Sequence, residues 1–343
     1  MQKVDLKSMT FAELQQFVED LGEKKFRTTQ LYQWMHQKMV KEFASMTNLS
    51  AAFRDKLEAQ AALNGCTMVK RQISADGTNK FLMELSDGNK VESVLMKYHH
   101  GNSVCISTQV GCRMGCRFCA SAIAGFVRNL TPAEMLLQIY ETERAQNCKI
   151  SSLVLMGIGE PLDNFDNVLR FLQLLSDPNG YGMSLRHVTV STCGVVPKIL
   201  ELAEQRLGLT LSVSLHCPND AGRSAIMPIN RSYPIDVLLD ACQTYFEKTG
   251  RRVTFEYAVM DQVNSAEQDA AALAERLKGL HAHVNLIPIN PVKERNFHTL
   301  KKTVLQFQKT LERYGIPATI RRTLGSDIEA ACGQLRRDAI QQT

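Results

Sequence analysis

Segments that read as β-strands alternate with helical patterns over about 220 residues of this chain, and this alternation limits the fold more than any other feature. Apolar and β-branched runs predict strands at residues 103–108, 153–156, 187–191, 210–215, 253–259, 284–287 and 318–320. The clearest helix start between them is Thr131-Pro132-Ala133-Glu134, because threonine suits the N-cap, proline the first helical position and glutamate the third. The alternation predicts an α/β fold with a parallel sheet, either open or closed into a full or partial barrel.

Two smaller regions precede this alternation. Helical spacing predicts helices at residues 10–21, from Thr28 onward and at residues 49–64. Residues 70–98 read as strands that are broken at the turns Asp76-Gly77 and Asp87-Gly88. We therefore expect a helical accessory domain at 1–68, a short β extension at 69–100 and the α/β barrel at 101–343, with the helical domain packed on the barrel.

Composition narrows the class of protein. With 44% hydrophobic and 22% charged residues, the chain of 343 residues suits a globular protein and is too apolar for a disordered one. No run of about 18 apolar residues is long enough to span a membrane. The first ten residues lack the apolar segment of a secretion signal, so we expect a cytoplasmic protein. In that compartment ten cysteines should be thiols or metal ligands rather than a disulfide framework.

Positive charge gathers in two places. Residues 292–343 hold ten lysines and arginines against five acidic residues, whereas the whole chain has a net charge of +5. Such a stretch suits contact with a polyanion such as RNA, or is a solvated helix face. Its members include Lys293, Arg295, Lys301, Lys302, Arg321, Arg322, Arg336 and Arg337. Near the N-terminus, Lys24, Lys25, Arg27 and Lys38 lie among Phe26, Tyr32 and Trp34. That mixture is typical both of nucleic-acid-binding modules and of the core and rim of a small helical bundle.

Three cysteines lie close together in Cys112-Arg-Met-Gly-Cys116-Arg-Phe-Cys119, directly after the first predicted barrel strand. Glycines at 111 and 115 allow the tight backbone that lets three sulfurs converge. A zinc site usually needs a second cysteine pair, which is missing, and a four-thiolate [4Fe–4S] site needs one more cysteine. Three thiolates on such a cluster leave one iron open to bind a small molecule.

This segment resembles the cluster-binding loop of the radical SAM enzymes, including the aromatic Phe118 before the last cysteine. The resemblance implies a [4Fe–4S] cluster held by Cys112, Cys116 and Cys119. It also implies that S-adenosylmethionine binds the open iron and is cleaved to a 5′-deoxyadenosyl radical. A zinc-bearing RNA-binding module without enzymatic activity is the alternative from another class.

Polar residues follow the other predicted strands, where α/β barrels place their chemistry. Residues expected to bind the cofactor are Gly159, Glu160, Ser191, Ser214, Leu215, His216 and Asn290. Taken singly, the glycine-rich segment at Met156–Pro161 could be an ordinary turn, and a lone histidine such as His216 is more often a structural residue. Clusters at the ends of successive strands are harder to assign to packing.

The segment Gly325-Ser-Asp327-Ile-Glu-Ala-Ala-Cys332-Gly333-Gln334-Leu335 is highly specific. Together with the motifs above, it makes nearly the whole chain resemble the RlmN/Cfr family of radical SAM adenosine methyltransferases. The resemblance implies methylation of a ring carbon of one adenosine in the peptidyl-transferase centre of 23S rRNA. The RlmN branch methylates C2 and also modifies an adenosine beside the tRNA anticodon, whereas the Cfr branch methylates C8 and confers antibiotic resistance. Glu160-Pro161 matches the C2 branch, where the C8 branch resembles Gly-Glu-Ala.

The family's scheme implies three further roles. Cys332 accepts a methyl group and carries it to the adenine, Cys105 resolves the covalent adduct through a transient disulfide with Cys332, and Glu92 takes the ring proton. A cellular reductant must then reopen the disulfide, and we expect a monomer. Without the resemblance, Glu92 would be a surface strand residue and Cys105 a buried core thiol. The remaining cysteines, expected to be packing thiols, are Cys66, Cys148, Cys193, Cys217 and Cys242.

Overall fold

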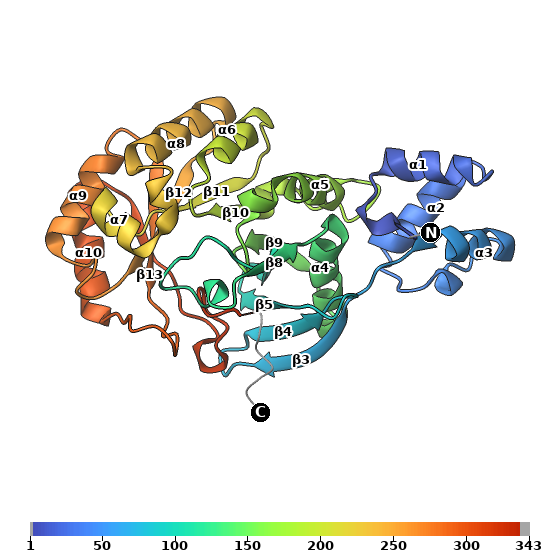
Figure 1. The fold of residues 1–343 in the computed structure, drawn as a ribbon, viewed down its shortest axis with the longest axis horizontal. Helices are drawn as coiled ribbons and strands as arrows, with labels where there is room; N and C mark the ends of the chain where they lie inside the picture. The colour runs from blue at the N-terminus through green and yellow to red at the C-terminus, as the bar shows by residue number, and fades with distance from the viewer. Residues whose placement is uncertain (1–2, 337–343) are drawn as a thin grey trace.

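A ten-stranded sheet runs through the centre of the molecule in the computed structural model, which describes residues 3–336. Its order is β14-β13-β12-β11-β10-β9-β6-β5-β4-β3 (Figure 1). The strands are β3 (Thr67–Ile73), β4 (Asn79–Glu84), β5 (Lys90–Tyr98), β6 (Gly101–Cys105), β9 (Ile150–Leu155), β10 (Val188–Thr192), β11 (Thr210–Ser214), β12 (Val253–Val259), β13 (Ala282–Pro288) and β14 (Ala318–Ile320). Neighbours from β6 to β14 are parallel, and β5, β4 and β3 continue the sheet antiparallel. The predicted partial α/β barrel with a β extension is therefore confirmed.

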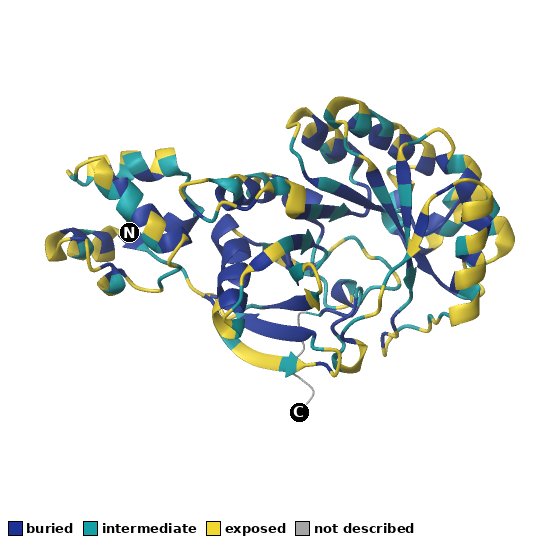
Figure 2. Ribbon diagram, turned by 180° about the vertical axis from the view of Figure 1, so that it is seen from behind, coloured by how far each residue is buried: buried dark blue, intermediate teal, exposed yellow. Residues whose placement is uncertain are grey.

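Helices cover the outer face of the parallel strands (Figures 1 and 2). They are α4 (Pro132–Gln146), α5 (Phe165–Ser176), α6 (Val196–Glu204), α8 (Ile235–Thr249), α9 (Glu267–Leu277) and α10 (Lys301–Arg313). The short helix α7 (Asp220–Ile226) packs instead beside the cysteine-rich segment, where the Arg117 amide donates to the Ile226 carbonyl. In α5 the buried residues Val168, Phe171, Leu172 and Leu175 recur at helical spacing and form one apolar stripe. The predicted start of α4 is confirmed, because Thr131 accepts a hydrogen bond from the amide of Glu134. The core lies between these helices and the sheet.

The N-terminal helices form a separate lobe at one end of the elongated molecule (Figure 1). The lobe contains β1 (Val4–Asp5), α1 (Phe11–Asp20), α2 (Phe26–His36), α3 (Ala51–Gln60) and β2 (Ala61–Ala62). It packs on the barrel, as expected. His36 Nδ1 lies 2.9 Å from the Tyr140 hydroxyl of α4, and the Tyr32 hydroxyl donates to Asp177 at 3.2 Å.

The predicted turns of the β extension are also present. Gly77 and Gly88 have φ angles of +85° and +80°, which glycine adopts at little cost. The amide of Gly77 donates to Ser74 at 3.0 Å, and that of Gly88 to Leu85 at 3.0 Å. The extension therefore adds two hairpins to the edge of the barrel sheet.

The first barrel strand differs from its prediction at 103–108, because β6 ends at Cys105. Ser107 has already left the ladder: its amide donates to Gln138 Oε1 at 2.8 Å and its hydroxyl to the Glu92 carbonyl at 2.7 Å. The cysteine loop also does not follow β6 directly. The short strand β7 (Gln109–Gly111) lies between them and pairs with β8 (Phe126–Asn129) beyond the loop.

The third predicted helix, at 49–64, is also shorter than expected. It ends at Gln60, because Ala61 pairs with Val4 of β1 in a small parallel sheet. No helix within residues 3–336 combines the length and the apolar composition that crossing a membrane requires.

Candidate active site

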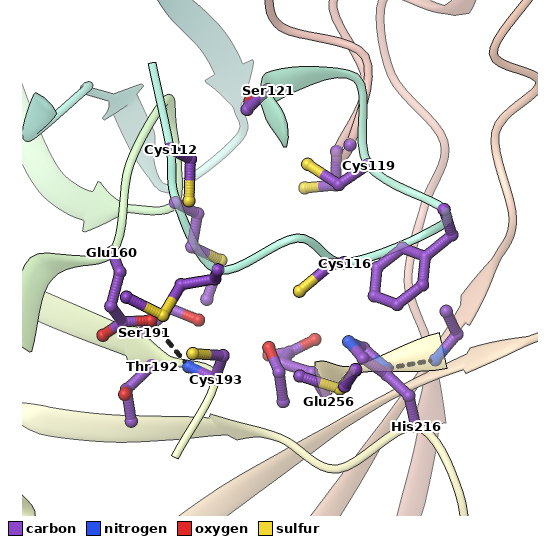
Figure 3. Close-up of a pocket in the computed structure, with 18 of the residues that line it drawn as sticks. Cys112, Cys116, Cys119, Ser121, Glu160, Ser191, Thr192, Cys193, His216 and Glu256 are labelled. Atoms are coloured by element: carbon purple, nitrogen blue, oxygen red, sulfur yellow. Dashed lines mark hydrogen bonds between the residues drawn. The ribbon is translucent and has the colours of Figure 1, made fainter. Parts of the chain in front are cut away.

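A cavity of about 160 Å³ lies inside the barrel at the carboxyl ends of the parallel strands (Figure 3). Its walls come from the cysteine loop, from the segments that follow β9, β10 and β11, from β12 and β13, and from the C-terminal segment. Of the predicted site residues, it is lined by Cys112, Cys116, Cys119, Gly159, Glu160, Ser191, Ser214, His216 and Cys332. Residues far apart in the sequence thus meet in one place.

The cysteine loop has a backbone that only glycine permits at its start. Gly111 has a φ of +76°, and a Cβ there would lie 1.8 Å from the Gly125 carbonyl oxygen. The chain is held beyond this point by hydrogen bonds from the amides of Cys112 to Gly125 (3.2 Å) and of Arg117 to Ile226 (2.9 Å). The loop therefore presents its thiols to the cavity from a fixed frame.

The donor set of this loop fits a polynuclear iron–sulfur cluster. Within residues 3–336, no three His, Cys, Asp or Glu side chains lie close enough to hold a single metal ion. Three thiols nevertheless line the same cavity, and thiolates are the ligands that iron–sulfur clusters bind. Burial raises the pKa of Cys112 to about 12, and coordination of a metal ion would favour the thiolate instead.

Glu160 ties two strand ends together. Its carboxylate accepts hydrogen bonds from the amides of Leu162 (3.0 Å) and Cys193 (2.7 Å), and its own amide donates to Gln109 Oε1 at 2.9 Å. Burial raises the pKa of this carboxyl group, and the amide donors oppose the rise. The thiol of Cys193, predicted to be a packing residue, also lines the cavity.

His216 lies on the opposite wall, in the left-handed region with a φ of +55°. Its Nδ1 accepts a hydrogen bond from the Ala258 amide at 2.9 Å, so the neutral ring carries its proton on Nε2. Burial, assisted by Arg223, lowers the pKa of His216 to about 3. Leu215, also predicted to bind the cofactor, does not line the cavity. Its amide donates to the Glu256 carbonyl at 3.1 Å.

Two charged cavity residues were missed by the sequence analysis. Glu256 of β12 accepts hydrogen bonds from Ser212 (2.7 Å) and Asn285 (2.8 Å), and Arg321, directly after β14, lies 3.8 Å from it. A charged residue within the apolar strand sequence of β12 was the available signal, because strands buried on both faces are near-continuous apolar runs. Arg321 was counted with the basic C-terminal stretch.

A second, smaller cavity adjoins the first and is lined by Cys105, Asn290 and Cys332, among others. Cys332 lines both cavities. Cys105 is buried beside Val94 of β5, its partner in the ladder, and burial raises the pKa of its thiol to about 12. Asn290 Nδ2 donates to the Cys332 carbonyl at 3.1 Å, so it contacts the C-terminal segment rather than the larger cavity.

Glu92 lines neither cavity. With 1% of its surface exposed, it is not the surface residue that its strand sequence alone suggested. It points to the same face of the sheet as Val94, two residues along β5, and therefore to the face that bears Cys105. All ten cysteines are free thiols, and Cys66, Cys217 and Cys242 are buried outside the larger cavity.

The basic regions are partly neutralised within the chain. Arg336 pairs with Glu294 at 2.7 Å and Lys293 with Glu329 at 3.5 Å, whereas Arg337 lies outside the described residues. In the N-terminal lobe, Tyr32 belongs to the core. Lys38 lies over the ring of Trp34, with its Nζ 3.5 Å from the ring centroid.

Known proteins are similar to this chain in sequence and in fold. Residues 4–63 match the ribosomal RNA large subunit methyltransferase N-terminal domain, and residues 106–274 match the radical SAM superfamily. The chain is 53% identical over 334 residues to the probable dual-specificity RNA methyltransferase RlmN of Lachnospira eligens, which covers 97% of this chain and 95% of that protein. Identity to the protein of the same name from Lachnoclostridium phytofermentans is 50% over 344 residues, with 100% and 97% covered.

A solved structure agrees with these relatives. The crystal structure of a radical SAM methyltransferase from Sphaerobacter thermophilus matches with a TM-score of 0.94 and 40% identity, and covers 98% of this chain and 100% of that one. The expected cofactors, a [4Fe–4S] cluster and S-adenosylmethionine, follow from the superfamily. The chain therefore belongs to the RlmN family of radical SAM RNA methyltransferases.

Proposed function

We propose that this enzyme methylates C2 of an adenosine in the peptidyl-transferase centre of 23S rRNA and of the adenosine beside the tRNA anticodon, with Cys332 as the methyl carrier. The observation that carries this proposal is the position of Cys332. It lines the cavity that holds the three loop thiols and also the cavity that holds Cys105. Cys332 can thus receive a methyl group in the larger cavity and form the disulfide with Cys105 in the smaller one.

Residues of the larger cavity form the proposed binding site for the cofactors. Cys112, Cys116 and Cys119 are the ligands for the cluster, and the strand-end residues around Glu160 and His216 form the wall for S-adenosylmethionine. When bound, these cofactors would supply the methyl group and a carbon radical that removes a hydrogen atom from the methyl group on Cys332, so that the methylene radical on Cys332 can add to the electrophilic ring carbon. The neutral ring of His216 adds a hydrogen-bond donor to the wall without adding charge.

Release of the product falls to two further residues. Glu92 takes the proton from the adenine ring, and burial, which raises the pKa of its carboxyl group, makes it a better base than an exposed glutamate. The Cys105 sulfur, having given up its proton, then bonds to the sulfur of Cys332 as the bond from that sulfur to the methylene carbon breaks. The electron pair of the broken bond passes to the adenine adduct, whose methylene carbon takes up a proton and becomes the methyl group. The disulfide that results must be reduced by a cellular thiol system before the next turnover, which suits the cytoplasm.

Analysis of the RNA product tests the position of methylation. Protein reconstituted without oxygen is incubated with unmodified 23S rRNA and tRNA transcripts, and the nucleosides are identified by mass spectrometry. We expect 2-methyladenosine in both RNAs. The motif Glu160-Pro161 and the relatives named dual-specificity methyltransferases support this choice. The appearance of 8-methyladenosine without 2-methyladenosine would overturn it.

Two cysteine variants test the covalent scheme. Cys105→Ala should leave RNA joined to Cys332, because the adduct forms but cannot be resolved. Cys332→Ala should give neither adduct nor product. Cys242→Ala, a buried thiol outside both cavities, is the matched control and should retain activity. Free, unmethylated RNA with Cys105→Ala contradicts the resolving role.

A further inference from the structure

Lys80 is a buried cation to which the proposed reaction gives no role. It lies on β4 with 6% of its surface exposed. Its Nζ lies 3.2 Å from Glu92 Oε1 and donates to the Glu329 carbonyl at 3.2 Å. In the ladder Leu82 faces Glu92 and Lys80 faces Val94, so Lys80 and Glu92 are diagonal neighbours on one face of the sheet. The ammonium group thus joins the proposed proton acceptor to the C-terminal segment.

The second oxygen of Glu92 is bound to that same segment. The amide of Arg336 donates to Glu92 Oε2 at 2.8 Å. Ala330 and Leu335 of the segment belong to the small apolar cluster that contains Val94. We call residues 325–336 the Cys332 loop. Both carboxylate oxygens of Glu92 are therefore engaged, one by Lys80 and one by the Cys332 loop.

The start of the Cys332 loop has its own anchor on the β3–β4 turn. Asp327 accepts hydrogen bonds from the Ser74 hydroxyl (2.6 Å) and the Ala75 amide (3.1 Å). Asp76 in turn accepts from the Gly325 amide at 2.8 Å. This anchor does not involve Glu92. Lys80 is thus the side chain of the β extension that contacts both Glu92 and the loop.

The groups around Glu92 indicate that Lys80 helps to keep the buried carboxyl group of Glu92 ionised. The charged groups that act on this carboxylate are Lys80 from β4 and Arg336 from the Cys332 loop, and the Ser107 hydroxyl binds its backbone carbonyl at 2.7 Å. Burial raises the pKa of Glu92, and Lys80 and Arg336 oppose that rise. A buried carboxylate without a paired cation is costly and tends to become protonated.

We propose that Lys80 is a positioning residue for methyl transfer: its ammonium group holds the carboxylate of Glu92 and the Cys332 loop in one fixed arrangement. The proposal rests on the proposed function, in which Glu92 takes the ring proton. Lys80 lines neither of the two cavities. It acts through Glu92 and the loop.

Proton transfer then weakens the arrangement. When the adenine ring carbon loses its proton to Glu92, the electron pair of the C–H bond stays with the adduct and the carboxylate becomes neutral. Lys80 loses its counter-charge and the Arg336 amide loses a charged acceptor, so both contacts weaken. The Cys332 loop is held less firmly at the step in which the sulfur of Cys332 must separate from the product.

The experiment compares Lys80→Met, Lys80→Arg and Lys90→Met. Lys90 pairs with Glu84 at 3.1 Å between the same two strands, so Lys90→Met removes an ion pair of β4 and β5 away from the Cys332 loop. In full-length, cluster-free protein, Lys80→Met should increase amide hydrogen exchange in residues 329–336, whereas Lys80→Arg and Lys90→Met should not. This measurement does not depend on turnover.

The second readout is the pH dependence of adduct decay in reconstituted enzyme with Cys105 intact. The rate of adduct decay should fall at low pH as Glu92 becomes protonated. In Lys80→Met this fall should occur at a pH that is higher by about one unit or more, and Lys80→Arg should restore the wild-type profile. A Lys80→Met profile that coincides with that of the wild type, with unchanged exchange in the loop, overturns the inference. If no RNA adduct forms in the Cys105→Ala background, the proposed function has failed instead.

Discussion

The side-chain amide of Asn290 donates a hydrogen bond to the backbone carbonyl of Cys332 at 3.1 Å. Asn290 follows β13 and was expected from the sequence to bind the cofactor, yet this contact makes it a support for the residue that carries the methyl group. Asn290→Ala removes the donor, and a typical net value for such a bond is about 1 kcal/mol. We therefore expect transfer from Cys332 to RNA to slow by about fivefold.

Single-turnover measurements with Cys332 methylated in advance isolate this step. Asn290→Asp is the matched variant, because it keeps the size of the side chain but places a carboxylate oxygen against a carbonyl oxygen. It should slow transfer more than Asn290→Ala. Equal rates for Asn290→Ala and the wild type would show that the contact does not support Cys332 during transfer.

Gly159 should tolerate no side chain. Its φ is +108°, and a Cβ there would lie 2.6 Å from the Cβ of Gln109, whose Oε1 binds the Glu160 amide. Gly159→Ala must therefore displace Glu160, and we expect at least a tenfold loss of affinity for S-adenosylmethionine, measured by equilibrium binding to reconstituted protein. Gly182→Ala is the control, because Gly182 has a positive φ of +75° but a Cβ there would be no nearer than 4.0 Å to another atom, the Asp177 carbonyl oxygen. Equal loss in both variants would assign the effect to backbone strain alone.

Of the cysteines that line the larger cavity, Cys116 and Cys193 should differ in their effect on the iron content of the protein. Cys116→Ala removes one ligand of the loop, and we expect the purified protein to lose its brown colour and most of its iron. Cys193→Ala should keep both, because Cys193 lies outside the cysteine loop and the substitution retains the backbone amide that donates to Glu160. Iron and sulfide assays after anaerobic reconstitution make the comparison. A colourless Cys193→Ala protein would place this thiol among the ligands.

Acid should weaken the junction between the N-terminal lobe and the barrel. Burial, assisted by Lys7, lowers the pKa of His36 to about 3, and the unfolded value is about 6.5. The unfolded chain therefore binds the additional proton between these pH values. The contribution of His36 to stability is present above pH 6.5 and falls as the pH drops toward 3, by about 1.4 kcal/mol per unit.

Urea unfolding at pH 8 and pH 5 checks this prediction. From the wild type, we expect a loss of about 2 kcal/mol from this one group between the two pH values. His36→Phe should show a smaller loss, although the pKa of His216 is also lowered and adds a pH dependence of the same sign. The same loss in His36→Phe and the wild type would show that His36 does not titrate as described.

Local signals in the sequence predicted much of the fold and part of the site. The capping residues of α4, the turn at Asp87-Gly88 and the spacing of the three cysteines depend on neighbours within a few residues, so a single sequence contains them. Motifs at successive strand ends could be placed together because parallel strands point their carboxyl ends to one edge.

Other features depend on contacts between distant segments. Lys80 acquires its environment from Glu329, and Glu92 from Arg336, both from the other end of the chain. The strand sequence alone suggested that Glu92 lies at the surface, because it could not show that a later segment covers this residue. The pair of Glu256 and Arg321 was missed for the same reason, because the contact joins β12 to the segment after β14.

The order of the segments along the chain also determines when the site can be completed during synthesis. The three cysteines of the loop follow β7 early in the barrel, whereas Cys332 follows β14, the last strand to be made. A growing chain therefore carries the metal ligands long before its methyl carrier emerges from the ribosome. Iron inserted at that stage would lie in a cavity that lacks the part of its wall formed by Cys332 and Gly333.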